Sequence, residues 1–232
     1  MLCSVVHWLW YNISQYLNWR EVVSQALVSA VTGIVLAGGK SLRLGREKAL
    51  EKLNAKSLLQ WTIDSLSRVS GSILIVTSQE QFALLSHAQC GGKVIVDIYP
   101  GKAALGGMYT GLSSASTAYS VVVGCDMPFL NNDLLQYQIA LAGGFDVVAL
   151  RIDGKVEPLH AVYSKTCLPF MKRLVSGSTL AISQLFNMVK TRYVDEEEVK
   201  RYDPQCLSIF NVNTEEDLRR ARALIKQIEM CT

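Results

Sequence analysis

The chain has 232 residues, 50% of them hydrophobic and 19% charged, which is typical of one globular domain with a full core or of one domain with a small appendage. A net charge of +3 is too small for the dense basic face of a nucleic-acid binder, so no nucleic-acid partner is expected. The six cysteines contain no CxxC pair and no metal-ligand spacing, which favours a reducing, cytoplasmic setting over a disulfide framework.

Residues 1–31 are predicted to form an amphipathic helical extension of a domain at residues 32–232. Apolar residues recur at helical spacing from Leu2 to Leu27. The extension has no Lys or Arg before its apolar run, unlike a signal peptide, and it lacks the roughly 18 uninterrupted apolar residues of a spanning helix. Its aromatic residues suit a membrane surface, but its polar side is poor in Lys and Arg, so membrane contact is the less favoured interpretation. The alternatives are a packing helix, an oligomer contact, or an assigned start codon upstream of the real one.

After Thr32, short apolar runs alternate with stretches of helical periodicity. This alternation predicts an α/β fold with a mostly parallel, Rossmann-like sheet and helices on both faces, and no linker divides it into two domains. Ligands bind beyond the carboxyl ends of such strands, so the residues after each apolar run are the candidates for chemistry. The predicted strands are residues 34–37, 72–77, 93–97, 120–124 and 145–149, the predicted helices are 49–69, 79–88, 104–115 and 132–141, and the acidic run 195–198 is expected to start a solvated helix.

The stretch GIVLAGGKSLRLGREK, residues 33–48, has the composition of a phosphate-binding loop. Its glycines do not have the spacing of a P-loop or of the dinucleotide pattern GxGxxG. Gly38 and Gly39 nevertheless let the backbone turn tightly at the end of the first strand and bring its amides close to an anion. The alternative is an ordinary turn between a strand and a helix, with solvated bases. Four bases that are suited to neutralise a triphosphate surround the turn: Lys40, Arg43, Arg46 and Lys48.

Two acidic residues follow predicted strands. In VVVGCDMPFL, Asp126 ends a continuous apolar run, and Pro128 stiffens the turn that displays it. A carboxylate at this place is costly to desolvate unless it is paired or binds a metal, and Mg²⁺ typically takes one or two carboxylates together with substrate phosphates. The alternative role is to cap the next helix, which Asn131 could do as well. Asp97 ends another strand and is the weaker candidate, for a ribose hydroxyl, a base amine or the metal.

These motifs resemble a known family. LAGGKSLRLGREKAL, residues 36–50, resembles the LAGGxSxRMGxxKAL signature of the molybdenum cofactor guanylyltransferases, MobA-like members of the nucleotidyltransferases, with Leu44 where methionine is usual. The likeness continues through GCDMPFL, EPLHAVY and FNVNTEEDL, in the expected order, and covers residues 33–224. It implies the three-layer α/β/α fold of the nucleotide-diphospho-sugar transferases.

The resemblance also implies roles for individual residues. In the nucleotide loop, Leu36, Ala37, Gly38 and Gly39 would contact a guanine nucleotide. Lys48 and Arg43 would stabilise the phosphates during catalysis, and Asp126 would bind Mg²⁺. Thr77 stands near the usual nucleotide-contacting asparagine, and Asp97 is an acid on the nucleotide side. The wall for the phosphate of the pterin acceptor would consist of Glu157, Pro158, Leu159, His160, Asn211 and Asn213. For His160, holding a loop is at least as good an interpretation.

Two departures from the family pattern bear on the choice of base. Thr77, Ser78 and Gln79 replace the asparagine that usually follows the second strand, and AALGG, residues 103–107, replaces a loop usually close to GPLxG. The double glycine at 38 and 39 favours guanine, because cytidylyltransferase relatives more often have Ala-Ala-Gly.

The implied reaction transfers GMP from Mg-GTP to the phosphate of molybdenum-molybdopterin and releases pyrophosphate. Cofactor insertion proteins or recipient molybdoenzymes are the expected protein partners. The alternatives are transfer from CTP, transfer to a sugar or polyol phosphate, and a nucleotide-binding regulator without activity. The altered loop and the extension keep the regulator open, whereas the presence of both Asp126 and Lys48 argues against it.

Overall fold

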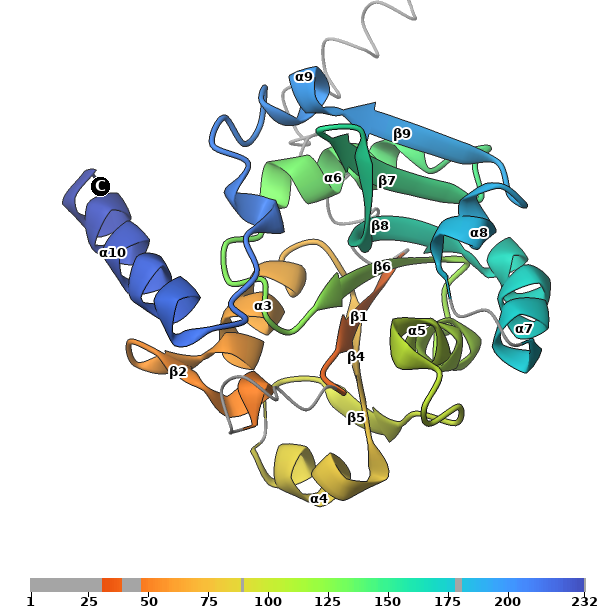
Figure 1. Cartoon of the computed structure of the whole chain (residues 1–232), viewed down its shortest axis with the longest axis horizontal. Helices are drawn as coiled ribbons and strands as arrows, with labels where there is room; N and C mark the ends of the chain where they lie inside the picture. The colour runs from red at the N-terminus through yellow and green to blue at the C-terminus, as the bar shows by residue number, and fades with distance from the viewer. Residues whose placement is uncertain (1–30, 39–46, 89, 178–180, 232) are drawn as a thin grey trace, which may run out of the picture.

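The computed structural model describes residues 31–38, 47–88, 90–177 and 181–231 (Figure 1). Of the predicted extension 1–31, residues 1–30 lie outside the described residues, and Val31 begins the first strand. None of the helices in the described part of the chain is long and apolar enough to cross a membrane.

A seven-stranded sheet forms the centre of the fold, with the strand order β5-β4-β1-β6-β8-β7-β9. The neighbours β5, β4, β1 and β6 are all parallel, and β7 and β9 are parallel to each other. Strand β8 runs antiparallel to both β6 and β7. The bounds are β1 Val31–Leu36, β4 Ser72–Thr77, β5 Lys93–Val96, β6 Tyr119–Gly124, β7 Val147–Ile152, β8 Lys155–Ser164 and β9 Thr191–Asp195. The sheet is therefore mostly parallel, as the sequence predicts.

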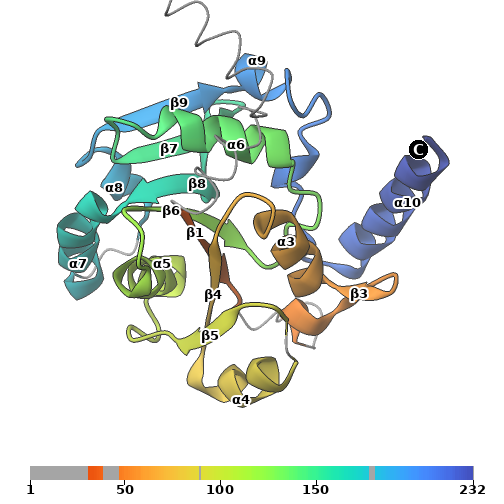
Figure 2. The same ribbon diagram turned by 180° about the vertical axis from the view of Figure 1, so that it is seen from behind.

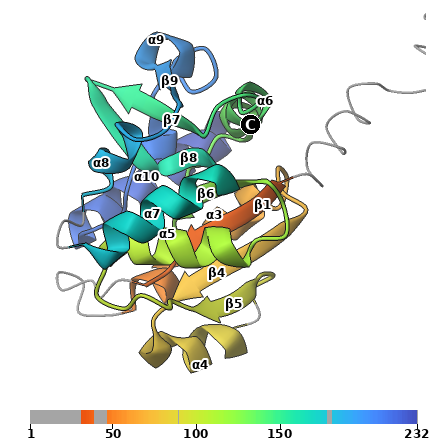
Figure 3. The same ribbon diagram turned by 90° about the vertical axis from the view of Figure 1, so that its right-hand side faces the viewer.

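Helices cover both faces of this sheet (Figures 1 and 2). Helices α5 and α7 lie together on one face, seen from the front in Figure 3, and α3 and α6 lie on the other. The longer helices are α3 Leu58–Leu66, α4 Gln79–His87, α5 Ala103–Ser114, α6 Asn132–Leu141, α7 Leu168–Ser176 and α10 Glu215–Cys231. The short elements are α8 Ser183–Phe186, α9 Glu196–Val199, the 3-10 turns η1 Lys48–Leu50, η2 Lys165–Cys167 and η3 Leu207–Ile209, and the hairpin β2 Lys52–Leu53 and β3 Lys56–Ser57.

Two apolar layers hold the helices on the sheet. Leu59 of α3 and Leu134 of α6 pack against one face, and Leu105 of α5 and Met171 of α7 pack against the other. Burial of each such side chain stabilises the fold by about 1.5–3 kcal/mol. A third cluster joins α10, through residues such as Leu218, to the β2–β3 hairpin and to α3. Helix α10 otherwise extends away from the sheet (Figure 1).

The structure corrects the predicted helix at residues 49–69. The helix α3 begins only at Leu58, where Ser57 caps it by accepting a hydrogen bond from the amide of Gln60 at 3.1 Å. The preceding residues form η1 and a hairpin, whose turn includes Asn54 with φ 57°. Asparagine tolerates this left-handed conformation, which breaks the helical periodicity. The acidic run does start a helix, because Asp195 caps α9 in a capping box with Glu198.

Candidate nucleotide site

A cleft of about 720 Å³ opens at the carboxyl ends of β1, β4, β5 and β6. This is the edge at which an open α/β sheet binds its ligands, and the volume suits a small-molecule ligand. Eight of the predicted site residues line it: Leu36, Ala37, Gly38, Lys48, Thr77, Asp97, Asp126 and Leu159. Lining residues that were not predicted as site residues include Ser78, Glu80, Gly107 and Cys125.

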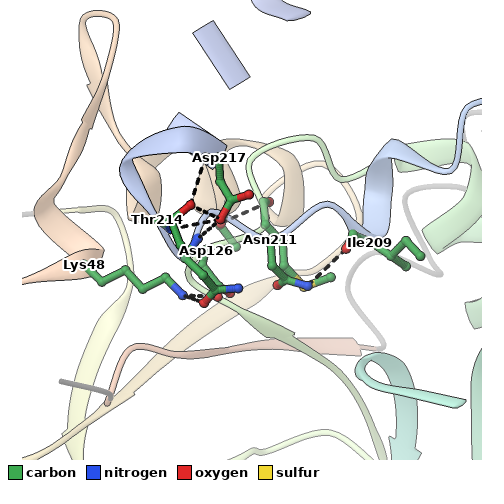
Figure 4. A network of polar contacts seen from close by, with 9 residues as sticks. Lys48, Asp126, Ile209, Asn211, Thr214 and Asp217 are labelled. Atoms are coloured by element: carbon green, nitrogen blue, oxygen red, sulfur yellow. Dashed lines mark hydrogen bonds and ion pairs between the residues drawn. The ribbon is translucent and has the colours of Figure 1, made fainter. Parts of the chain in front are cut away.

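At the β6 end of the cleft, one ammonium group meets two oxygens from distant parts of the chain. Lys48 Nζ donates to Asp126 Oδ2 (Figure 4). The same Nζ also donates to Asn213 Oδ1. The side chains of Lys48 and Asp126 are 13% and 17% exposed, so solvent screens this ion pair only in part. Gly124 is required here, because a Cβ on it would overlap Asp126 Oδ1. The glycine thus allows the Asp126 carboxylate to fold back at the end of β6.

The segment before α10 is fixed directly on this site. The amide of Val212 donates to the carbonyl of Asp126 at 3.0 Å. Asp217 Oδ2 accepts the amides of Asn213 at 3.0 Å and Thr214 at 2.9 Å. In return, Thr214 Oγ1 caps α10 by accepting the amide of Asp217 at 3.1 Å. Asn211 instead donates its side-chain amide to the carbonyl of Ile209 (Figure 4). Of the two predicted asparagines, Asn213 therefore contacts Lys48 and Asn211 bonds locally.

At the β5 end, Asp97 is held by neutral groups. Its Oδ1 accepts the amide of Tyr99 at 2.9 Å and the hydroxyl of Thr110 at 2.8 Å. Burial raises the pKa of Asp97, and the hydrogen bond from Thr110 offsets part of this rise. A Cβ on Gly106 would lie 2.6 Å from the Tyr99 carbonyl, so glycine lets α5 approach the Asp97 loop closely. The start of α5 lines the cleft, where helix amides suit an anion.

In the altered loop 103–107, the first residue has a backbone conformation that favours the glycine of the family pattern GPLxG. Ala103 has φ 49°, in the left-handed region that favours glycine. The residue begins α5 and lines the cleft. The family pattern GPLxG, which has glycine at this position, thus suits the backbone that the structure shows.

Strand β8 brings one residue of the predicted acceptor wall to the cleft. The register between β7 and β8 shifts at Ala149 and Leu150, and Leu159 lines the cleft. Glu157 Oε1 accepts the amide of Leu159 at 3.1 Å, and the Pro158 carbonyl accepts the Tyr163 hydroxyl at 2.9 Å. Burial raises the pKa of Glu157, and the charge of Asp126 adds to the rise. Glu157 thus holds the backbone of Leu159 and is not itself among the residues that line the cleft.

His160 lies in the core and does not reach the cleft. Its side chain is fully buried, at 0% exposed, and its ring nitrogens have no hydrogen-bond partner among the described residues. Burial lowers the pKa of His160 to about 4, although the charge of Asp203 opposes this shift. The ring is therefore neutral near pH 7, and a ligand cannot touch it without movement of β8. The sequence alone did not reveal this burial, because EPLHAVY has no strict alternation.

The remaining predicted residues lie outside the described part of the chain. These are Gly39 and Arg43, with the neighbouring bases Lys40 and Arg46. Among the unpredicted lining residues, Cys125 has its pKa raised to about 12, mainly by burial and further by Asp126, so it remains a thiol. The sequence signal for Ser78 and Glu80 is their place directly after β4.

Comparisons with known proteins identify the family. Residues 33–190 match the family model described as the MobA-like NTP transferase domain. A "probable molybdenum cofactor guanylyltransferase" of Peptoclostridium acidaminophilum is 31% identical over 208 residues, 87% of this chain and 91% of the relative. The molybdenum cofactor guanylyltransferase of Desulfosudis oleivorans is also 31% identical, over 86% of this chain and 98% of the relative.

Solved structures show the same fold. The molybdopterin-guanine dinucleotide biosynthesis protein A of Archaeoglobus fulgidus superposes with a TM-score of 0.75 and 25% identity, covering 84% of this chain and 99% of that one. A 4-diphosphocytidyl-2C-methyl-D-erythritol synthase of Anaerococcus prevotii has a TM-score of 0.66 at 15% identity, over 87% and 99% of the two chains, and shares the fold alone. The chain therefore belongs to the MobA-like family of NTP transferases, which are nucleotidyltransferases.

Proposed function

We propose that this protein transfers GMP from GTP to the phosphate of molybdenum-molybdopterin and releases pyrophosphate. The observation that carries the proposal is the meeting of Lys48, Asp126 and Asn213 at the β6 end of the cleft. The names of the curated relatives support GMP as the transferred group and the molybdenum cofactor as the product. GTP and molybdenum-molybdopterin are the proposed substrates, and cofactor insertion proteins or recipient molybdoenzymes are the proposed partners.

The reaction places few demands on proton transfer. The acceptor phosphate attacks the α-phosphorus of GTP in line, so one phosphorus–oxygen bond forms as the bond to the leaving pyrophosphate breaks. A phosphate monoester is doubly ionised above its second pKa of about 6, so no general base is needed. Catalysis then consists of positioning and charge stabilisation. The Lys48 ammonium stabilises the negative charge that gathers on the leaving group, and Leu159 bounds the acceptor side.

The donor set at Asp126 fits Mg²⁺. The Lys48 ammonium bonds to the carboxylate of Asp126 and to the amide oxygen of Asn213, so two hard oxygen donors already surround one positive charge. Among the described residues, no group of three or more His, Cys, Asp and Glu side chains is placed to hold a metal ion. One carboxylate, together with phosphates and water, is a common Mg²⁺ environment. When bound, Mg²⁺ would neutralise phosphate charge, and Asp126 and Asn213 would hold it.

A cytoplasmic setting is part of the proposal. The four cysteines in the described part of the chain, Cys90, Cys125, Cys167 and Cys206, are all free thiols. Free thiols are the usual state in a reducing compartment, which supports this setting.

The proposed function is tested by pyrophosphate release from the purified protein with Mg²⁺ and molybdenum-loaded molybdopterin. GTP, CTP and ATP are compared in parallel, with a reaction that lacks the acceptor as the control. We expect release with GTP and little with CTP or ATP. Release with CTP would retain the transfer chemistry and overturn the choice of base. No release with any nucleotide would overturn the proposal in favour of another acceptor or a regulator.

A further inference from the structure

A buried glutamine lies below the β4 end of the cleft and connects two segments of the site. The Thr77 hydroxyl donates to Gln81 Oε1 at 3.1 Å, and Gln81 Nε2 donates to the Glu47 carboxylate. Gln81 is 7% exposed and Thr77 is 1% exposed, so water competes little for these hydrogen bonds. Gln81 therefore joins the end of β4 to the residue that precedes Lys48.

Gln81 makes these contacts in place of a local one. The sequence Ser78-Gln79-Glu80-Gln81 has the spacing of a capping box, in which Ser78 and Gln81 would satisfy each other's backbone amides. In α4, however, Ser78 makes no capping hydrogen bond through its side chain among the described residues. By contrast, Ser57 and Asn131 do cap α3 and α6. Helix α4 thus forgoes a cap of about 1 kcal/mol. Such departures from local rules are expected at functional sites.

Glu47 also makes a distant contact in place of a local one. It occupies the N-cap position of η1, yet its side chain makes no capping hydrogen bond there among the described residues. The next residue, Lys48, bonds to Asp126 and Asn213. The chain that enters η1 is therefore held from α4 through Glu47 and from β6 through Lys48. This double attachment matters because a misplacement of about 1 Å can cost about 100-fold in rate.

We propose that Gln81 is a positioning residue for nucleotidyl transfer. It fixes Glu47 and thereby Lys48. Ser78, a residue that lines the cleft, makes no capping hydrogen bond through its side chain among the described residues, so its hydroxyl is kept for the nucleotide. Gln81 itself is not among the lining residues, so it acts through its neighbours. The inference rests on the proposed function, to which it adds a residue from outside the signature motifs.

A reciprocal exchange tests this role. Gln81→Glu places two carboxylates against each other, and we expect kcat/KM for GTP to fall about 10- to 100-fold, through both a lower kcat and weaker GTP binding. The double variant Glu47→Gln with Gln81→Glu restores the hydrogen bond between positions 47 and 81 with donor and acceptor exchanged, and residue 81 still accepts the Thr77 hydroxyl, so we expect recovery to within about threefold of the original rate. Gln81→Met keeps the length of the side chain but removes its polar groups. This variant replaces Gln81→Glu in the test if Gln81→Glu fails to fold. Gln136→Met, at an exposed position on α6 that does not line the cleft, is the matched control and should leave the rate unchanged.

Thermal unfolding of each variant separates positioning from stability. A double variant no faster than Gln81→Glu, or a fully active Gln81→Met, would overturn the proposal. If the original protein releases no pyrophosphate, the proposed function fails, and the positioning role is read from Mg-GTP affinity by calorimetry. There the same pattern is expected: weaker binding in Gln81→Glu and recovery in the exchanged pair. Equal GTP affinity in all variants would overturn the positioning role independently.

Discussion

The two ends of the cleft each hold a carboxylate, and the two carboxylates have different surroundings. Asp126 is paired with the ammonium group of Lys48, and the amide oxygen of Asn213 shares that cation. Asp97 accepts hydrogen bonds only from neutral groups among the described residues, Thr110 and Tyr99, and burial raises its pKa. A paired charge suits phosphates and a cation, whereas an acceptor with neutral partners suits hydroxyl or amine groups of a nucleoside. We therefore propose that the β6 end of the cleft receives the phosphates and that the β5 end receives the nucleoside.

The largest effect is expected at the phosphate end. Asp126→Asn removes the charge but keeps the shape, and we expect pyrophosphate release to fall about 100- to 1000-fold, by analogy with the loss of one electrostatic group in other active sites. The measurement is kcat at saturating GTP and Mg²⁺, with unfolding temperature as the control for the fold. A rate near that of the original protein would show that Asp126 does not act on the phosphates, and the proposed difference between the two ends of the cleft would then be wrong.

His160 lies outside both ends of the cleft, and we expect it to affect the stability of the fold but not the reaction. The folded protein holds the pKa of His160 at about 4, below its ordinary 6.5, because burial disfavours the charged ring. Above pH 6.5 the ring is neutral in both states, so the group adds no pH dependence. As the pH falls from 6.5 toward 4, the unfolded chain binds a proton that the folded protein does not, and stability falls by up to about 3 kcal/mol.

His160→Met should therefore reduce the loss of stability between pH 7 and pH 5. The measurement is denaturant unfolding of both proteins at the two pH values. KM for the acceptor should remain unchanged at pH 7, because the ring does not reach the cleft. A raised acceptor KM with unchanged stability would instead assign His160 to the wall.

A smaller effect is expected at the nucleoside end. Asp97→Asn retains one oxygen for Thr110 and Tyr99 but loses the charge, so we expect KM for GTP to rise about 10-fold with little change in kcat. Because burial raises the pKa of Asp97, the original protein should lose GTP affinity on acidification earlier than an ordinary carboxylate would, and the variant should not. Steady-state kinetics across pH check both statements. A fall in kcat alone would place Asp97 with Asp126 at the phosphate end.

The smallest effect concerns the backbone of the nucleoside end. Ala103→Gly should relieve the left-handed conformation at φ 49° and raise stability by about 1 kcal/mol, or about 2–4 °C in unfolding temperature. Asn54→Gly, at φ 57° in the β2–β3 turn, is the matched variant and should gain less, because asparagine tolerates this region. Calorimetric melting of both variants is the measurement. Equal gains at the two positions would show that Ala103 carries no particular strain.

Much of the fold follows from local pattern. Strand β4 and helix α6 agree with the predicted ranges 72–77 and 132–141, because continuous apolar runs and helical periodicity are local signals. Strands β8 and β9, the helices α7 and α8 between them and the helix α10 were not predicted, whereas the start of α9 was. Strand β8 contains Pro158 and a register shift, which obscure its pattern. The predicted helix at 49–69 failed for a similar reason, since the turn at Asn54 divides a periodic stretch.

The sequence by itself determined which residues end the strands of the parallel half, and hence that Asp97 and Asp126 face one cleft; Lys48 was assigned to it from the base-rich loop after the first strand and from the family resemblance. It did so because strand direction and apolar pattern are encoded within a few residues. Only the tertiary structure decided that Asn213 meets Lys48 across 165 positions, that Gln81 bonds to Glu47, and that His160 is buried. These outcomes depend on strand order and on the packing of loops from distant segments. No local preference specifies such contacts, because their energy exists only once the sheet has assembled.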